Sequence, residues 1–244
     1  MAIIVNADDF GLSEEVNNAI AEAFEKKLID RTTLMVGMPA AEQAMELAMQ
    51  KGFADKVGLH LNLTSGKPLS YAISSDPFMC NKAGEYTADF ARNMKTRFFL
   101  PKGTSIAIEE EIRAQFDRYA KLGGTLWHID SHHHVHTDPS IWRVLKKVFS
   151  DRPVSSVRLG RNMYRGGNVL MRLYKLMLNA SIRKYCSGNP RYFGSAEDYR
   201  EYIKTAPDLA SRAEVEVMVH PVYDSSGNLA DVSKGQFYAL ERLH

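Results

Sequence analysis

The sequence has 244 residues, of which 45% are hydrophobic and 25% charged, so it can bury a full core and suits one α/β barrel-like domain. Its 31 basic and 29 acidic residues leave a formal charge of +2 and are mixed along the chain, which argues against a nucleic-acid or membrane surface. No apolar run approaches the roughly 20 residues that cross a bilayer, no secretory signal precedes the first predicted strand, and the two cysteines lack disulfide or metal spacing. We therefore expect a cytoplasmic protein with a single domain over residues 1–244.

Hydrophobic patterning predicts that strands and helices alternate. In chain order, the first half is expected to contain a strand at 2–6, a helix at 13–28, a strand at 32–38, a helix at 39–52 and a strand at 57–64. Residues 65–104 lack periodicity and are predicted to form a long excursion with one helix near 88–98. The second half is expected to contain a helix at 105–122, strands at 125–130, 154–159, 191–193 and 214–220, and helices at 138–149, 169–185 and 196–204.

This alternation implies parallel strands with crossover helices, either closed into a barrel or left as an open sheet. About seven strands favour an irregular (β/α) barrel-like fold. Ser13 and Asp138 are the predicted N-caps of two helices, and Gly52 is the predicted stop of a third. In the third strand, Leu59 and Leu61 alternate with His60, so its two faces are expected to differ chemically.

Acidic and histidine side chains recur where the predicted strands end. Asp8 and Asp9 follow the first strand, His60 lies on the third, His132 follows the fourth, and His220 ends the last. In a barrel the carboxyl ends of the strands share one face, which carries the active site. The common position makes these residues a stronger signal than any one of them alone.

Their chemistry indicates a metal. The adjacent carboxylates Asp8 and Asp9 cannot both stay ionised in a dry site unless a cation or hydrogen-bond donors offset their repulsion, although such a pair alone also occurs in turns and helix caps. Residues 128–136 hold five of the eight histidines, and an incidental polar loop is the alternative to a metal site. If His60, His132 and one Asp were ligands, open positions would remain for water and substrate, as in a catalytic site.

Other residues are candidates for supporting roles. Asp130, His134 and His136 are candidates to contact substrate or to fix the orientation of the metal-binding imidazoles. Arg158, on the fifth predicted strand, is a candidate to orient Asp8 by a charged hydrogen bond, and a surface salt bridge is the alternative. The sequence has no phosphate-binding loop, dinucleotide fingerprint or nucleophile elbow.

Four segments together resemble the YdjC-like carbohydrate deacetylases, which include chitooligosaccharide deacetylases. The segments are residues 6–13 (NADDFGLS), 58–64 (GLHLNLT), 128–136 (HIDSHHHVH) and 219–221 (VHP). The resemblance implies a barrel-like fold, often a homodimer, and removal of acetyl groups from small N-acetylated sugars. It also implies a further helix and short strand, after residue 244, that help to close the barrel.

The resemblance further implies site roles. Asp9, His60 and His132 would bind one divalent metal ion, Asp8 would be the base and His220 the acid, and water on the metal would attack the acetamide carbonyl. Relatives of this kind are usually recorded with Mg²⁺, whereas two imidazole ligands alone favour Zn²⁺ or another transition metal, so the metal stays open.

Two other functions remain as alternatives. A metal-dependent phosphoesterase or other amidohydrolase of related shape would usually carry His-x-His after the first strand, where this chain has two aspartates. A metal- or sugar-binding protein without activity would bind metal stoichiometrically but show no turnover. Substrate contacts are expected in the irregular stretch 65–104.

Overall fold

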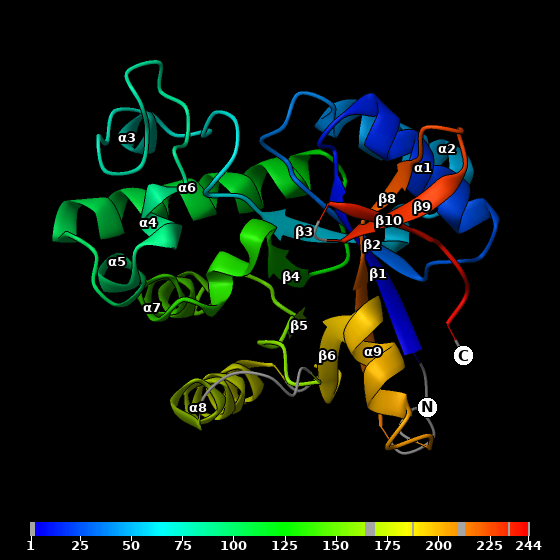
Figure 1. Cartoon of the computed structure of the whole chain (residues 1–244). Helices are drawn as coiled ribbons and strands as arrows, with labels where there is room; N and C mark the ends of the chain where they lie inside the picture. Colours follow the sequence, from blue (N-terminus) through cyan, green and yellow to red (C-terminus); the bar gives the residue numbers. More distant parts are fainter. Residues whose placement is uncertain (1–2, 164–168, 187, 209–212, 234, 244) are drawn as a thin grey trace.

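The computed structural model describes residues 3–163, 169–186, 188–208, 213–233 and 235–243. The main strands in this part are β1 (Ile3–Phe10), β2 (Arg31–Leu34), β3 (Val57–Leu61), β4 (His128–Ser131), β5 (Ser156–Val157), β6 (Tyr192–Ser195) and β7 (Val215–Val219). They form one parallel sheet in the order β5-β4-β3-β2-β1-β7-β6, which curls into a half-barrel (Figure 1). The predicted α/β barrel-like fold with about seven strands is therefore confirmed.

One long helix follows each of the first six strands and lies outside the sheet (Figure 1). These helices are α1 (Glu14–Glu25), α2 (Ala41–Lys51), α6 (Lys102–Lys121), α7 (Pro139–Val148), α8 (Val169–Tyr185) and α9 (Ala196–Ile203). As predicted, Ser13 caps α1 by accepting a hydrogen bond from the Val16 amide at 3.2 Å, and Gly52 ends α2 with a left-handed φ of 74°. Among the helices described, none combines the length and apolar character needed to cross a bilayer.

Several boundaries of strands and helices differ from those predicted. The strand expected at 2–6 runs on to Phe10, so Asp8 and Asp9 lie within β1 rather than after it, and residue 2 falls outside the described residues. β2 ends at Leu34, earlier than expected. Asp138 occupies the N-cap position of α7 but does not cap it, because its carboxylate accepts a hydrogen bond from Nε of Arg97 at 2.6 Å instead.

The excursion after β3 contains three short helices, α3 (Tyr71–Ser74), α4 (Asp89–Arg92) and α5 (Met94–Phe98), where a single helix near 88–98 was expected. Asn93 separates α4 from α5 because its backbone is extended and its side chain caps the amide of Lys95 at 2.9 Å. Glu111 of α6 is buried and accepts hydrogen bonds from the amides of Leu69 and Ser70 at 3.1 and 2.7 Å. These bonds attach the first part of the segment between β3 and α6 to α6.

A small antiparallel sheet after β7 was not predicted. Its strands are β8 (Pro221–Tyr223), β9 (Leu229–Ser233) and β10 (Gln236–Ala239). The turn between β8 and β9 is built by Asp224, whose carboxylate accepts hydrogen bonds from the amides of Ser226 and Asn228, and by Gly227 with a φ of 79°. This sheet packs against α1 beside the carboxyl end of β7 (Figure 1).

The main sheet has one apolar face and one polar face. Leu59 and Leu61 of β3 are buried on the side opposite His60, as the alternation in the sequence predicted. The inner face of the half-barrel carries buried polar and charged side chains from five strands and the residue after β5: Asn6, Asp8, Thr33, His60, Asp130, Arg158 and Glu216. The fold therefore surrounds a charged interior with apolar contacts to the helices.

Candidate metal centre and active site

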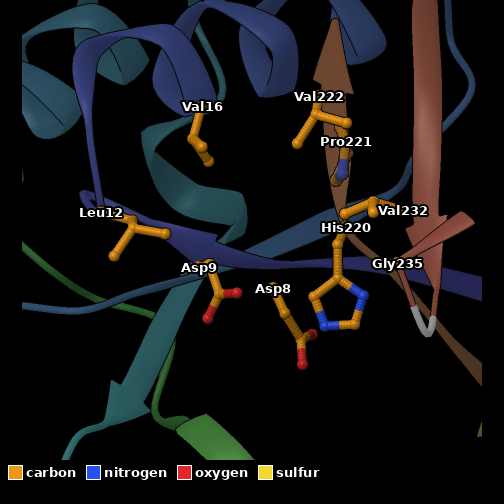
Figure 2. Close-up of a pocket in the computed structure, with 9 residues that line it drawn as sticks. All are labelled: Asp8, Asp9, Leu12, Val16, His220, Pro221, Val222, Val232 and Gly235. Atoms are coloured by element: carbon orange, nitrogen blue, oxygen red, sulfur yellow. The ribbon is translucent and has the colours of Figure 1, made fainter. Parts of the chain in front are cut away.

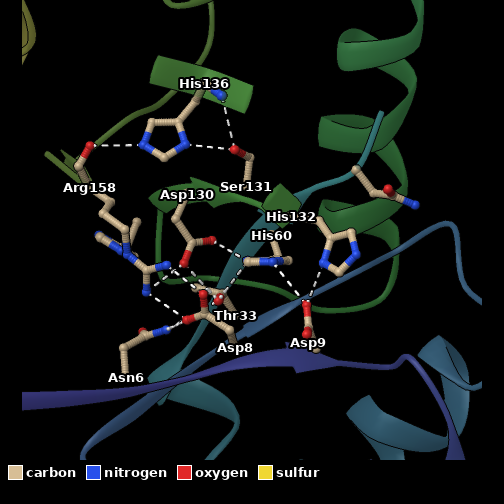
Figure 3. A network of polar contacts seen from close by, with 12 residues as sticks. Asn6, Asp8, Asp9, Thr33, His60, Asp130, Ser131, His132, His136 and Arg158 are labelled. Atoms are coloured by element: carbon tan, nitrogen blue, oxygen red, sulfur yellow. Dashed lines mark hydrogen bonds and ion pairs between the residues drawn. The ribbon is translucent and has the colours of Figure 1, made fainter. Parts of the chain in front are cut away.

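The polar face ends in a cluster of carboxylates and imidazoles at the carboxyl ends of the strands (Figure 3). Asp8 and Asp9 come from β1, His60 from β3 and Asp130 from β4. His132 begins the 3-10 helix η2 (His132–Thr137), which directly follows β4. Parallel strands bring their carboxyl ends to one edge, so residues far apart in the sequence meet here.

The backbone adopts unusual conformations at this edge. Asp9 has a φ of 67° and lies at a register shift in β1, a bulge that redirects its side chain. His133 and His134 also have positive φ values, 54° and 55°. Thus three of the five non-glycine residues with positive φ in the described ranges lie beside the cluster. Such conformations are costly and concentrate at functional sites.

Asp9, His60 and His132 each turn one potential ligand atom toward a common point. Oδ1 of Asp9 lies 3.2 Å from Nε2 of His60 and 2.8 Å from Nδ1 of His132. Ligand atoms that share an ion at about 2.0–2.2 Å lie about 3 Å apart, so these separations fit one divalent metal. Burial favours the neutral acid, but hydrogen bonds from His132 and His60 hold the pKa of Asp9 well below its usual value. Asp9 and His132 remain 15% exposed, which leaves a path to solvent.

Asp130 fixes the orientation of His60. Nδ1 of His60 lies 2.7 Å from Oδ1 of Asp130, whose other oxygen accepts a hydrogen bond from the Thr33 hydroxyl at 3.0 Å. Nδ1 therefore carries the proton, and Nε2 faces Asp9. Burial opposes the imidazolium, but the charge of Asp130 and the hydrogen bonds to Asp130 and Asp9 raise the pKa of His60 to about 10. When Nδ1 carries the only proton, the lone pair on Nε2 of His60 and the facing carboxylate of Asp9 repel each other unless a proton or a metal ion lies between them. The facing atoms of His60 and Asp9 therefore suit a bound cation.

A second potential ligand set, Asp8, His60 and Asp130, is less suitable. Nη2 of Arg158 lies 2.7 Å from Oδ1 of Asp8 and 2.8 Å from Oδ2 of Asp130. The guanidinium thus already supplies the positive charge between these two carboxylates, and a metal ion there would be repelled by it. Asp9, His60 and His132 are the better ligand set, and their role as ligands stays a prediction.

Arg158 holds Asp8 from inside the half-barrel. Its Nη1 and Nη2 donate to the two oxygens of Asp8 at 2.6 and 2.7 Å, and Nδ2 of Asn6 donates to Oδ1 at 2.9 Å. The Arg158 side chain is 0% exposed, so the alternative of a surface salt bridge is wrong. Among the residues described, Oδ2 of Asp8 accepts from Arg158 alone, which leaves it a free lone pair.

The buried network continues to Glu216 of β7, which sequence analysis missed. Its Oε1 accepts a hydrogen bond from Nε of Arg158 at 2.6 Å, and its Oε2 lies 3.2 Å from Nη2 of Arg31. Burial favours the neutral acid, but the charges of Arg158 and Arg31 hold the pKa of Glu216 well below its usual value. The sequence does contain a signal for this residue, which is an acidic side chain inside the apolar run 215–219. Acidic residues are rarely buried without a partner, so the pattern predicts a buried ion pair.

His220 lies beside Asp8 at a cavity of about 270 Å³, where Asp9 is also exposed (Figure 2). The backbone amide of His220 donates to Oδ1 of buried Asp231 in β9 at 2.8 Å. The small antiparallel sheet therefore positions the predicted acid. The rest of the cavity wall is mainly apolar and consists of Leu12, Val16, Pro221, Val222, Val232 and Gly235.

His133 lies beside a candidate ligand, whereas His134 packs against β6. The ring of His133 packs on that of His132 with their centres 4.1 Å apart, and its Nδ1 lies 3.1 Å from the Thr64 hydroxyl oxygen. His134 was predicted to support an imidazole or to contact substrate, and its ring packs edge-on against Phe193 at 5.9 Å.

His136 supports Arg158 rather than a metal-binding imidazole. It is buried, its Nε2 donates to the carbonyl oxygen of Arg158 at 3.1 Å, and its Nδ1 lies 2.6 Å from Oγ of Ser131. Burial lowers the pKa of His136 to about 4, so the ring is neutral at physiological pH. Because the side chain is 0% exposed, direct contact with substrate is excluded in this conformation.

Comparison with known proteins identifies relatives. Residues 2–242 match the family described as YdjC-like protein. A protein named "Carbohydrate deacetylase" from Vibrio cholerae is 41% identical over 150 residues, which span 61% of this chain but only 55% of that protein. Proteins of the same name from Halalkalibacterium halodurans and Brevibacillus brevis are 34% and 32% identical, over 91% and 99% of this chain and 86% and 88% of their own lengths. A crystal structure of an Enterococcus faecalis V583 protein is 25% identical, covers 92% of this chain and 82% of that one, and gives a TM-score of 0.68.

Proposed function

Because the chain belongs to the YdjC-like protein family, we propose that it is a metal-dependent hydrolase that removes acetyl groups from small N-acetylated sugars. The names of its relatives support the substrate class. The observation that carries the proposal is the convergence of Asp9, His60 and His132 on one point, next to a cavity that also exposes Asp8 and His220.

Asp9, His60 and His132 hold the metal in this proposal. A divalent ion bound there would polarise the carbonyl oxygen of an acetamide and lower the pKa of a water molecule. Two imidazoles and one carboxylate suit Zn²⁺ or another transition ion, whereas the family resemblance implies Mg²⁺. Two measurements distinguish Zn²⁺ or another transition ion from Mg²⁺. The first is metal analysis of the purified protein, and the second is reactivation of the metal-free protein with each ion.

Asp8 and His220 move the protons. Oδ2 of Asp8, with its free lone pair, accepts the proton of the attacking water, and Arg158 keeps the carboxylate in place. His220 donates a proton to the departing amine nitrogen, and Asp231 fixes the backbone that carries it. The apolar cavity wall lies against the sugar or its acetyl methyl group. The cavity of about 270 Å³ suits a small sugar or one end of a longer one.

The test is acetate release from N-acetylated mono- and disaccharides, before and after chelation and after the return of each divalent metal. We expect release that disappears with chelator and returns with metal. Faster hydrolysis of phosphate esters in the same preparations would favour a phosphoesterase. Stoichiometric metal without turnover on any acetylated sugar would indicate a binding protein instead.

We further propose that the protein acts in the cytoplasm as a homodimer, as the family resemblance implies. Light scattering at several concentrations measures the oligomer, and a mass of one protomer throughout would contradict it. Cell fractionation tests the location.

A further inference from the structure

We propose that Glu216 is a positioning residue that orients the guanidinium of Arg158 and, through it, the carboxylate of Asp8. This inference rests on the proposed function, because Asp8 is the base in that reaction. Glu216 lies on β7, and Asp8 lies on the neighbouring strand β1. The two carboxylates bind different edges of one guanidinium.

Arg158 is held on all its edges. Nε donates to Glu216 at 2.6 Å, Nη1 donates to Asp8 at 2.6 Å, and Nη2 lies 2.7 Å from Asp8 and 2.8 Å from Asp130. One face of the guanidinium lies over the ring of Phe193, 4.8 Å from its centre. A planar group with these fixed contacts cannot rotate unless one of them breaks.

Glu216 binds the Nε edge of the Arg158 guanidinium, whereas Asp8 binds the Nη atoms. Glu216 therefore sets the tilt of the guanidinium relative to Asp8. Its side chain is 1% exposed and does not line the cavity, so it does not contact substrate. Its Oε1 also lies 3.6 Å from Nε2 of buried His128, and Glu216, His128 and Asp130 form a third group of potential ligand atoms, which already faces the guanidinium of Arg158.

The second oxygen of Glu216 pairs with Arg31 of β2, and Nε of Arg31 donates to Asn6 at 2.8 Å, which in turn donates to Asp8. The direct contact with Arg158, which itself binds Asp8, is the shorter connection, and the proposal concerns that connection.

A third buried carboxylate around one arginine is expensive in desolvation, and the ion pair of Glu216 with Arg31 offsets part of that cost. Asp8 and Asp130 already neutralise Arg158. The position of Glu216 is therefore explained by the chemistry proposed at the cavity. Glu216 fixes the orientation of the Arg158 guanidinium, which in turn fixes the direction of the Asp8 lone pair.

Glu216→Gln tests this geometry because the amide keeps the shape but replaces one acceptor by an NH₂ donor. That donor must face either Nε of Arg158 or Nη2 of Arg31, both of which are donors themselves, so one guanidinium must move. We expect kcat for acetate release to fall about 10- to 100-fold, with KM and metal stoichiometry within twofold of the wild type.

Glu216→Asp keeps the charge but withdraws the carboxylate by one methylene, so it cannot contact both guanidiniums at the present distances. It should also lower kcat at least fivefold without changing KM. This variant keeps the proposal testable if Glu216→Gln does not fold. A kcat for Glu216→Asp within twofold of the wild type would overturn the proposal.

Tyr119→Phe is the matched control for lost stability. The Tyr119 side chain is buried, and its hydroxyl lies 2.6 and 2.7 Å from the carbonyl oxygens of Val57 and Leu126, at the amino end of β3 away from the site. Its loss should lower the unfolding temperature but leave kcat within twofold of the wild type. If Tyr119→Phe and Glu216→Gln, compared at equal folded fraction, lowered kcat equally, Glu216 would have only a structural role.

The decisive experiment is a double-mutant cycle with Arg158→Lys, since an ammonium group cannot hold three carboxylates in one plane. If Glu216 acts through Arg158, Glu216→Gln should change kcat by no more than twofold in the Arg158→Lys background. An equal loss in both backgrounds would overturn the proposal. Failure of the wild type to release acetate would overturn the proposed function together with this inference, whereas an active wild type with unaffected Glu216 variants would overturn the inference alone.

Discussion

Replacing Asp8 by Asn tests the proposed proton acceptor separately from the proposed metal ligands beside it. Both Asp8 oxygens accept hydrogen bonds from Arg158, at 2.6 and 2.7 Å. An Asn side chain has one oxygen, so its NH₂ group must face an N–H of the guanidinium. The variant thus loses one charge-assisted hydrogen bond, worth about 1.5–3 kcal/mol. Because Asp130 and Glu216 still neutralise Arg158, the loss in unfolding free energy should stay near 2–3 kcal/mol, below the roughly 3–5 kcal/mol of a fully broken buried pair.

The expected effect on activity is larger than the effect on stability. Without a carboxylate at position 8, proton acceptance fails, and kcat should fall by at least about 10²-fold. Metal stoichiometry should not change, since Asp9, His60 and His132 remain. Metal content, acetate release and thermal unfolding should be measured on the same preparation, with Tyr119→Phe as the control for destabilisation.

Two results would refute this reasoning about Asp8. Turnover close to that of the wild type would show that another group accepts the proton. Loss of bound metal in Asp8→Asn, with metal retained in Asp9→Asn, would show that the two aspartates have exchanged roles.

Other predictions concern the metal ligands, the proton donor and pH. Replacing Asp9, His60 or His132 by Ala should abolish stoichiometric metal binding in calorimetry while the chain stays folded; undiminished affinity in all three would contradict the ligand set. His220→Ala should bind metal normally but cleave the sugar amide at least about 10²-fold more slowly, and an activated aryl acetate should be slowed less; equal slowing would count against proton donation. Burial raises the pKa of Asp138 to about 6, so its contribution to stability is complete below about pH 4 and is lost as the pH rises through 6. Thermal unfolding of Asp138→Asn should lack this dependence, worth up to about 3 kcal/mol, and a variant that kept it would refute the assignment.

Strand periodicity made the position of the site predictable. All seven predicted strands are present, and the residues at their carboxyl ends meet because parallel strands share that edge. This is why Asp9, His60 and His132, which are separated widely in the sequence, could be grouped from the sequence alone. Their placement at one edge of the sheet required only the order of the elements.

The local geometry was less predictable. The bulge that turns Asp9 toward the two imidazoles depends on pairing between β1 and β2, which the pattern of β1 alone does not contain. Glu216 was missed because one acidic residue in an apolar strand has no periodic signal, and its partners Arg158 and Arg31 come from other parts of the sheet. The strands β8 to β10 are short and lie close together, where a period of two is hard to detect.

The buried charges indicate why the inner face of this half-barrel is polar. Asp8, Asp130 and Glu216 surround Arg158 and Arg31, so these groups together carry one net negative charge at the base of the site. An apolar filling of equal volume would stabilise a fold at least as well, because burying ions costs more than their pairing returns in many proteins. In the proposed function, the charged interior adds a fixed negative environment that would attract a cation toward Asp9 and would keep Asp8 in place as a proton acceptor. The network of buried ion pairs around Arg158 therefore accounts for two features. It makes the interior less stabilising than an apolar one would be, and it supports the chemistry proposed at the carboxyl ends of the strands.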